Sequence, residues 1–229
     1  MKKRLTRPSL AGLARRFPTT GGNGYLYLPL LSAAIAARDE AASRLIMETA
    51  LDRRIRPAQI IEIILQSHLF LGFPAMIEAL RLFARVRGRK HKNIGPPPAY
   101  RGTTVRRWHR QGMAKIQKIY GDAFDRLVAY INAFSPQTLA WMVNDGYGQV
   151  LSRPGAPFRL RELCVVATLT VSLYENQLWA HVRGTLNLGV APTLVRRTIV
   201  NCRYFCPDEQ IVAALKIMDA AALSDAQTI

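Results

Sequence analysis

Residues 161–192 have the sequence RELCVVATLTVSLYENQLWAHVRGTLNLGVAP, and this stretch decides the fold. Its apolar residues recur at spacings of three and four, which places them on one face of a helix. Asn176 is a candidate N-cap for a helix that continues through His181, and Gly189 suits the left-handed position after its last turn. Pro192 is suited to the first turn of the next helix. The stretch therefore predicts successive helices joined by short turns.

The same helical spacing continues along nearly all of the 229 residues. After Pro57, apolar residues stand at positions 60, 61, 63, 64 and 65, and a second set at helical spacing stands at 124, 127, 128 and 131. Alternating β-branched stretches, which are typical of strands, are missing. With 49% hydrophobic residues the chain can bury a real core, which excludes a disulfide-stapled miniprotein and disorder throughout. We predict an all-α helical bundle.

An internal match divides the chain. A shift of 135 residues superimposes residues 28–80 on 163–215 without gaps, and both prolines at helix starts, Pro57 and Pro192, coincide. We predict two tandem copies of one helical unit. The predicted parts are a basic N-terminal arm (1–24), a degenerate first repeat (25–88), a basic linker rich in Pro and Gly (89–104) and a second repeat (105–229).

The positive charge is concentrated in two segments. The chain has 32 Lys and Arg against 15 Asp and Glu, a formal net charge of +17. Residues 1–38 and 79–121 contain no acid and hold seven and twelve basic residues, so the remainder is slightly acidic. We expect weak polyanion contact through the arm and the linker. Direct readout of DNA is not expected, because no helix-turn-helix, zinc module or RNA-binding aromatic motif is found.

The cysteines and the N-terminus bear on localisation. Cys164, Cys202 and Cys206 form neither a zinc spacing nor Cys-x-x-Cys, and this low odd count suits a reducing compartment. Arg15-Arg16-Phe17 and the apolar run at 25–37 loosely resemble an export signal, but the run is too short to span a bilayer. We predict a cytoplasmic protein with no membrane span, no metal and no cofactor.

Several motifs carry a resemblance to a known family. They are Arg161-Glu162-Leu163, Glu175 to Gly184, Asn187 to Val190, Arg107, Gly112, Ile119-Tyr120-Gly121, Tyr147 to Val150 and Ser152 to Gly155. Together they resemble the carboxymuconolactone decarboxylase family, which includes the alkyl hydroperoxidase D-like proteins. Residues 28–85 resemble a second, poorer copy. The resemblance implies an all-helical bundle that assembles as a homo-oligomer, a trimer or another multiple, with the two halves packed as an internal pseudo-dimer.

The resemblance also implies site residues. The peroxidase branch of that family has a Glu, then Cys-x-x-Cys, then a His; Glu162 and His181 match the Glu and the His, while Tyr174 and Gln177 stand at the cysteine positions. Without a thiolate there is no nucleophile for a peroxide, so thiol peroxidase activity is disfavoured.

What remains is cofactor-independent acid/base chemistry of the decarboxylase or lactone type on a small carboxylated substrate. Here His181 is the candidate general acid/base and Glu162 orients it. Arg153 and Arg161 are expected to bind substrate carboxylates, with Tyr174 and Gln177 also at the site.

Other interpretations stay open. Counted from the turn between their helices, Glu162 and His181 are out of step by roughly 9 Å at 1.5 Å per residue, so contact needs tilted helices or a bridging water. His181 could be structural, and Arg161-Glu162 a solvated pair or an interhelical salt bridge. The chain could also be a non-catalytic scaffold or polyanion-binding protein, or a thiol peroxidase that uses Cys202 and Cys206. In the first copy Glu62 and His68 are expected to have ordinary helical or surface roles.

Overall fold

The computed structural model describes residues 5–16, 22, 24–88 and 104–223, and every regular element within them is helical. The prediction of an all-α protein is confirmed. In chain order the elements are α1 (Arg7–Arg16), α2 (Gly24–Ala36), α3 (Glu40–Asp52), α4 (Pro57–Gln66), α5 (His68–Arg87), α6 (Thr104–Tyr120), η1 (Gly121–Ala123), α7 (Phe124–Phe134), α8 (Pro136–Trp141), η2 (Met142–Val150), α9 (Phe158–Ser172), α10 (Glu175–Asn187), α11 (Pro192–Asn201), η3 (Cys202–Tyr204) and α12 (Asp208–Leu223).

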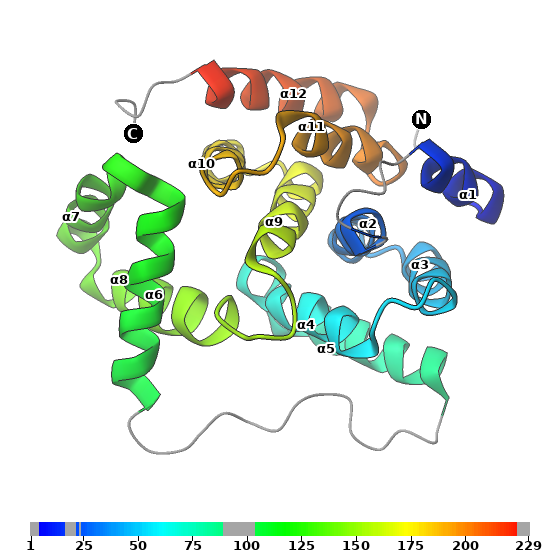
Figure 1. Ribbon diagram of the computed structural model, residues 1–229, viewed down its shortest axis with the longest axis horizontal. Coiled ribbons are helices and arrows are strands. Elements are labelled where there is room, and N and C mark those ends of the chain that lie inside the picture. The colour runs from blue at the N-terminus through cyan, green and yellow to red at the C-terminus, as the bar shows by residue number, and fades with distance from the viewer. Residues whose placement is uncertain (1–4, 17–21, 23, 89–103, 224–229) are drawn as a thin grey trace.

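Helices α2 and α9 pack against each other at the centre of the molecule (Figure 1). Both are apolar on all sides, and nearly every residue of each is buried. A helix of this kind is stable only when other helices surround it. Helices α3, α4 and α5 cover α2, and α10, α11 and α12 cover α9, so the two central helices form a shared core.

The helices around α2 and around α9 correspond closely. Helices α3 and α10, and likewise α4 and α11, begin and end 135 residues apart. The turns correspond too, because Arg38 and Leu173 both have positive φ, as do Arg54 and Gly189. The predicted left-handed Gly189 is thereby confirmed. The two segments thus share their geometry as well as the sequence match, and that they are copies of one unit stays a prediction.

Two local predictions have different outcomes. Pro57 and Pro192 each occupy the first turn of a helix, as expected. Asn176 is not an N-cap, because α10 begins one residue earlier and Tyr174 at the cap position makes no side-chain hydrogen bond. The acidic Glu175 in the first turn instead complements the positive end of the helix dipole.

The predicted N-terminal arm contains a packed helix. Leu5 and Leu10 are buried in the core with α2 and α3, and Arg7 pairs with Glu48 of α3 at 2.9 Å. Residues 89–103 of the predicted linker lie outside the described residues.

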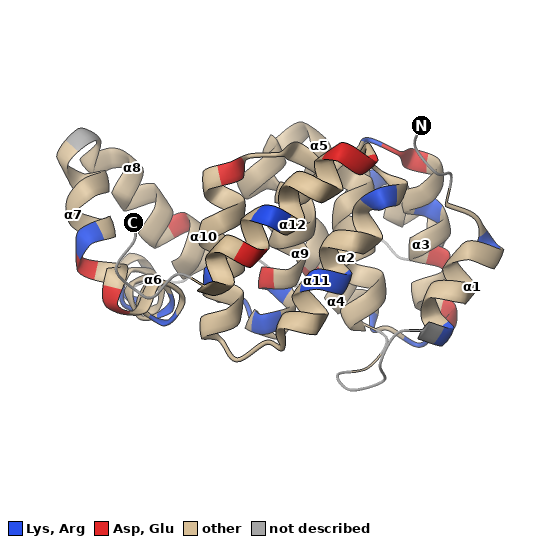
Figure 2. Ribbon diagram, turned by 90° about the horizontal axis from the view of Figure 1, so that it is seen from above, with Lys and Arg blue, Asp and Glu red and all other residues tan. Residues whose placement is uncertain are grey.

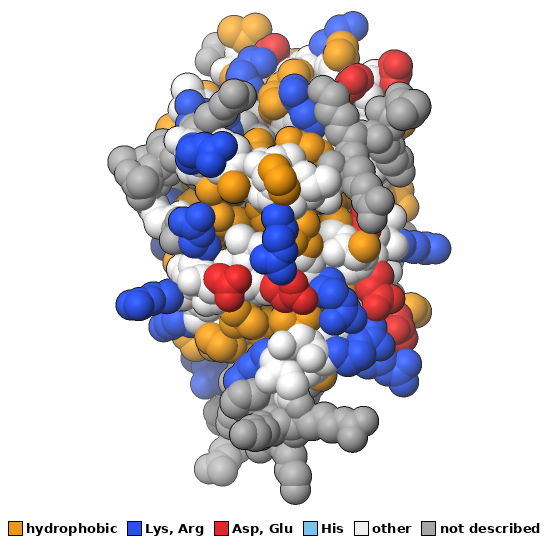
Figure 3. Space-filling view, turned by 90° about the vertical axis from the view of Figure 1, so that its right-hand side faces the viewer, with side chains coloured by type: hydrophobic (Ala, Val, Ile, Leu, Met, Phe, Trp, Pro, Cys, Tyr) orange, Lys and Arg blue, Asp and Glu red, His pale blue; other side chains and the backbone are white. Residues whose placement is uncertain are grey.

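In the described part of the chain, acidic and basic residues are interspersed over the helical bundle (Figure 2). On the side where α1 and α3 lie, basic side chains are scattered among apolar patches, with a group of acidic ones below (Figure 3). That side offers no continuous basic surface.

No helix in the described part of the chain combines the length and the apolar character that a membrane span requires.

Helix α6 packs on η2 through two glycines. A Cβ at Gly112 would overlap the carbonyl oxygen of Val143, and one at Gly148 would overlap that of Trp108. These neighbours are backbone atoms, which cannot rotate away as a flexible side chain would. The close approach of α6 and η2 therefore requires glycine at both positions.

Gly148→Ala should lower the free energy of unfolding by about 3 kcal/mol, because the new methyl group forces the two backbones apart. Gly146→Ala is the matched control in the same helix, since its Cβ would meet only an ordinary contact at 3.9 Å from the Trp141 carbonyl. Urea denaturation of both variants measures the difference. Equal stability of the two would contradict the close packing.

Candidate functional site

Glu162 of α9 and His181 of α10 are in direct contact. The Nδ1 atom of His181 lies 2.8 Å from Oε2 of Glu162, and both side chains are buried. Helix α10 is seen end-on in Figure 1 whereas α9 runs obliquely across the view, so the two helices cross at a steep angle. The axial offset of roughly 9 Å holds for parallel helices, and the pair meets by the first of the two expected routes, tilted helices. The tilt of the helices allows contact without a bridging water.

The hydrogen bond determines which nitrogen of His181 can act. A carboxylate accepts from the Nδ1–H, which leaves Nε2 as the nitrogen available for proton transfer. The His181 backbone is held in turn by Thr185, whose hydroxyl donates to the His181 carbonyl at 2.6 Å. Both partners of the pair are thus fixed by regular helices.

One atom of the pair is unpartnered. Oε1 of Glu162 is buried and has no hydrogen-bond partner among the described residues. A buried carboxylate oxygen without a donor is costly, and such atoms are exceptional in folded proteins. This oxygen is therefore available to a ligand or a water molecule.

Aromatic residues surround the pair. The ring of Phe70, from α5, meets the His181 ring edge-on with 5.5 Å between centroids. The hydroxyls of Tyr120 and Tyr147 are hydrogen-bonded to each other, burial raises the pKa of Tyr120 to about 12, and burial also raises the pKa of Tyr147. The negative charge of Glu162 adds to both increases. Both tyrosines are therefore neutral donors near Glu162.

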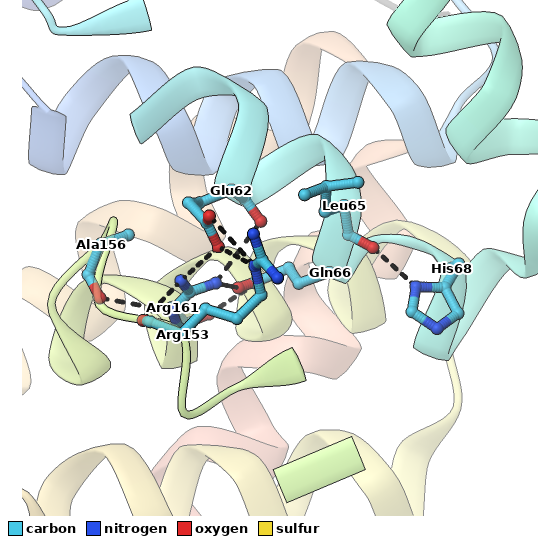
Figure 4. A network of polar contacts seen from close by, with 7 residues as sticks. All are labelled: Glu62, Leu65, Gln66, His68, Arg153, Ala156 and Arg161. Atoms are coloured by element: carbon cyan, nitrogen blue, oxygen red, sulfur yellow. Dashed lines mark hydrogen bonds and ion pairs between the residues drawn. The ribbon is translucent and has the colours of Figure 1, made fainter. Parts of the chain in front are cut away.

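The arginines predicted to bind substrate are engaged elsewhere. Arg161 is fully buried and donates through Nη2 to Glu62 of α4 at 2.8 Å, and Arg153 donates through Nε to the same carboxylate at 2.9 Å (Figure 4). Arg161 also donates to Gln66 Oε1 at 3.3 Å and to the Ala156 carbonyl. The Arg161-Glu162 dipeptide is thus not a solvated pair. Instead, Arg161 forms an interhelical salt bridge with Glu62.

Glu62 does not have the surface role expected of it. Only 2% of it is exposed, and a Cβ at Gly155 would overlap its Cγ, so the loop before α9 closes tightly over the carboxylate. A signal was present in the sequence, because Glu62 stands among isoleucines at positions 60, 61, 63 and 64, which form a buried face. His68 is local, with Nδ1 at 2.6 Å from the Leu65 carbonyl.

Comparison with known proteins agrees with this arrangement. No family model matches the chain. Over 98 residues it is 26% identical to 4-carboxymuconolactone decarboxylase of Acinetobacter baylyi, a match that covers 42% of this chain and 73% of that protein. Over this region the chain is therefore similar to a carboxymuconolactone decarboxylase. Its all-helical architecture is the one expected from that resemblance.

The remaining residues predicted for the site lie at its edge. Tyr174 and Gln177, which stand where the peroxidase branch of the family has cysteines, are both exposed at the start of α10. Among the described residues, neither side chain forms a hydrogen bond with Glu162 or His181.

The three cysteines are buried and form no disulfide among the described residues. Burial raises the pKa of Cys164 to about 12 and raises that of Cys202 far above its ordinary value. A buried thiol of high pKa is a poor nucleophile, which weighs against a peroxidase that uses Cys202 and Cys206. The described residues also contain no cluster of His, Cys, Asp and Glu suited to hold a metal ion.

Glu62→Gln should lower the free energy of unfolding by about 3–5 kcal/mol, because it leaves the buried Arg161 without a counter-charge. The matched control is Glu78→Gln, which removes an exposed pair with Arg81 and should cost no more than about 1 kcal/mol. Chemical denaturation measures both. If Glu62→Gln were as stable as the control, the ion pairs of Glu62 with Arg153 and Arg161 would not be what holds α4 against α9.

Proposed function

We propose that this protein is a cofactor-independent acid/base enzyme of the decarboxylase or lactone type that acts on a small carboxylated substrate. The observation that supports it is the buried hydrogen bond between His181 Nδ1 and Glu162 Oε2. A carboxylate behind an imidazole fixes its tautomer and stabilises the imidazolium that forms during proton transfer. Imidazole is the side chain best suited to exchange protons near neutral pH.

In a decarboxylation the bond between the substrate carbon and its carboxylate breaks, and the electron pair stays on that carbon. The imidazolium of His181 delivers the Nε2 proton to this carbon, and carbon dioxide leaves. Glu162 remains ionised throughout and compensates the positive charge on the ring. His181 then recovers a proton from solvent. A lactone-type reaction would use the same pair in the reverse sense, with Nε2 taking a proton first.

The surroundings of the pair favour this chemistry. Leu163, Leu178 and Val182 form a buried apolar cluster around α9 and α10, with Phe70 packed against it. Loss of carbon dioxide replaces a charged group by a neutral one, which a water-poor site favours. The pair lies in such surroundings, since no more than 5% of either side chain is exposed.

The relationship between the two halves belongs to the same proposal. We infer that the first half is a degenerate copy, in which Tyr27 and Ile46 stand where the second half has Glu162 and His181. It acts as an internal partner that supplies Phe70 to the site of the other half. A trimer of this chain would then imitate a hexamer of single-copy relatives.

Polyanion binding is a second candidate, supported by one observation. Helix α6 exposes a row of basic side chains. They are Arg106, Arg107, Arg110 and Lys118. Contact through this row would be electrostatic and would weaken steeply with salt.

Turnover tests the first proposal. With 4-carboxymuconolactone, the substrate in the name of the Acinetobacter relative, and with related carboxylated lactones, His181→Ala and Glu162→Gln should each reduce carbon dioxide release by about 10²–10⁴-fold. His109→Ala is the control, because His109 is exposed on α6 and bonds only Asn144. Circular dichroism confirms that the variants fold. Activity that survives both site substitutions would refute the assignment.

A further inference from the structure

The proposed chemistry needs a cation for the substrate carboxylate, and the arginines closest in sequence are engaged. Arg153 and Arg161 share the carboxylate of Glu62. Arg159 and Arg183 donate to backbone carbonyls at the end of α10 and in α12. Each of these guanidinium groups is thus held by a bond within the protein. A cation near the pair that makes no such bond is a better candidate.

Lys115 of α6 lies beside the Glu162–His181 pair. Its Nζ is 4.0 Å from the centroid of the Phe158 ring. Phe158 and Glu162 are four residues apart on α9, so they occupy the same face one turn from each other. Phe158 thus joins Lys115 to the turn of α9 that precedes Glu162, and the charge of Glu162 acts on the ammonium group.

A second contact orients the same face of α6 toward His181. Ile119 follows Lys115 by four residues and packs so closely on Gly184 of α10 that a Cβ there would overlap it. The Asn187 side chain also donates to the Ile119 carbonyl at 2.6 Å. Helix α6 is therefore packed on α10 by the face that carries Lys115, and Lys115 lies one turn along α6 from the contact of Ile119 with Gly184.

The ammonium group has no counter-ion. Among the described residues no carboxylate lies within salt-bridge distance of Lys115. Burial lowers the pKa of Lys115, and the charges of Lys118 and Arg161 lower it further, while Glu162 acts in the opposite sense. The face of Phe158 only partly replaces the lost solvent. A partly buried cation of this kind gains from an anion that binds beside it.

We propose that Lys115 is the residue that binds the substrate carboxylate, holding a small carboxylated lactone or unsaturated acid between the Phe158 ring and the Glu162–His181 pair. The role of His181 in this arrangement rests on the proposed function. The ammonium separates the ligand carboxylate from Glu162, whose charge would otherwise repel it. The body of the ligand is then in contact with aromatic rings, and its reacting carbon faces His181.

Binding tests this inference without turnover. Isothermal titration calorimetry with the dicarboxylate adipate should show binding to the wild-type protein, and Lys115→Met should weaken it by about 10- to 100-fold. Lys115→Arg, which keeps the charge, should retain most of the affinity. Lys216→Met is the matched control, because Lys216 is exposed on α12. Absence of wild-type binding, or equal affinity in Lys115→Met and the control, would overturn the inference.

Kinetics separate this inference from the proposed function. Lys115→Met should raise KM more than it lowers kcat, whereas His181→Ala should act mainly on kcat. If Lys115 binds adipate but the wild-type protein turns over no carboxylated lactone, the proposed function fails and the carboxylate site stands. If turnover occurs and Lys115→Met changes neither KM nor adipate affinity, the carboxylate site fails and the function stands.

Discussion

The buried carboxylate of Glu62 is the interaction on which the arrangement of the two halves depends. It comes from α4, in the first half, and it compensates Arg161 and Arg153 from the second half at 2.8 and 2.9 Å. Arg161 directly precedes Glu162. The Arg161–Glu62 ion pair, which holds the first turns of α9, therefore also positions the candidate catalytic carboxylate of Glu162. Removing Glu62 would leave a charged guanidinium in the core, which is far more costly than the pair itself is stabilising.

Packing of α2 on α9 makes the two halves parts of one core, yet only the second half has a carboxylate and an imidazole at these positions. Tyr27 and Ile46 occupy the positions in the first half that correspond to Glu162 and His181 in the second. All four residues are buried. The first half still contributes to the site through Phe70, which touches His181. If the first half is a degenerate copy, as we propose, it remains necessary because it supplies Phe70 and the carboxylate of Glu62 to the other half.

Sequence patterns predict the helices and their starts well, because proline, glycine and apolar spacing act locally: Pro57, Pro192 and Gly189 all have the predicted roles. The Glu162–His181 pair was predicted through family resemblance, but its direct contact depends on a crossing angle that spacing along the chain does not contain. The partner of Arg161 lies 99 residues away, so neither its engagement nor the burial of Glu62 follows from neighbouring residues. Lys115 could not be singled out from the sequence either, because it stands in an acid-free basic stretch in which most charged side chains are solvated.

The account's central claim is that Glu162 holds His181 in the form with a proton on Nδ1 and with Nε2 available for proton transfer. Long-range ¹H–¹⁵N correlation spectra of the folded protein, with His181→Ala used to assign the ring, test this directly. In neutral His181 the proton should reside on Nδ1, and Glu162→Leu, which leaves no acceptor, should remove that preference. A neutral ring protonated on Nε2, or a tautomer unchanged by Glu162→Leu, would contradict the account.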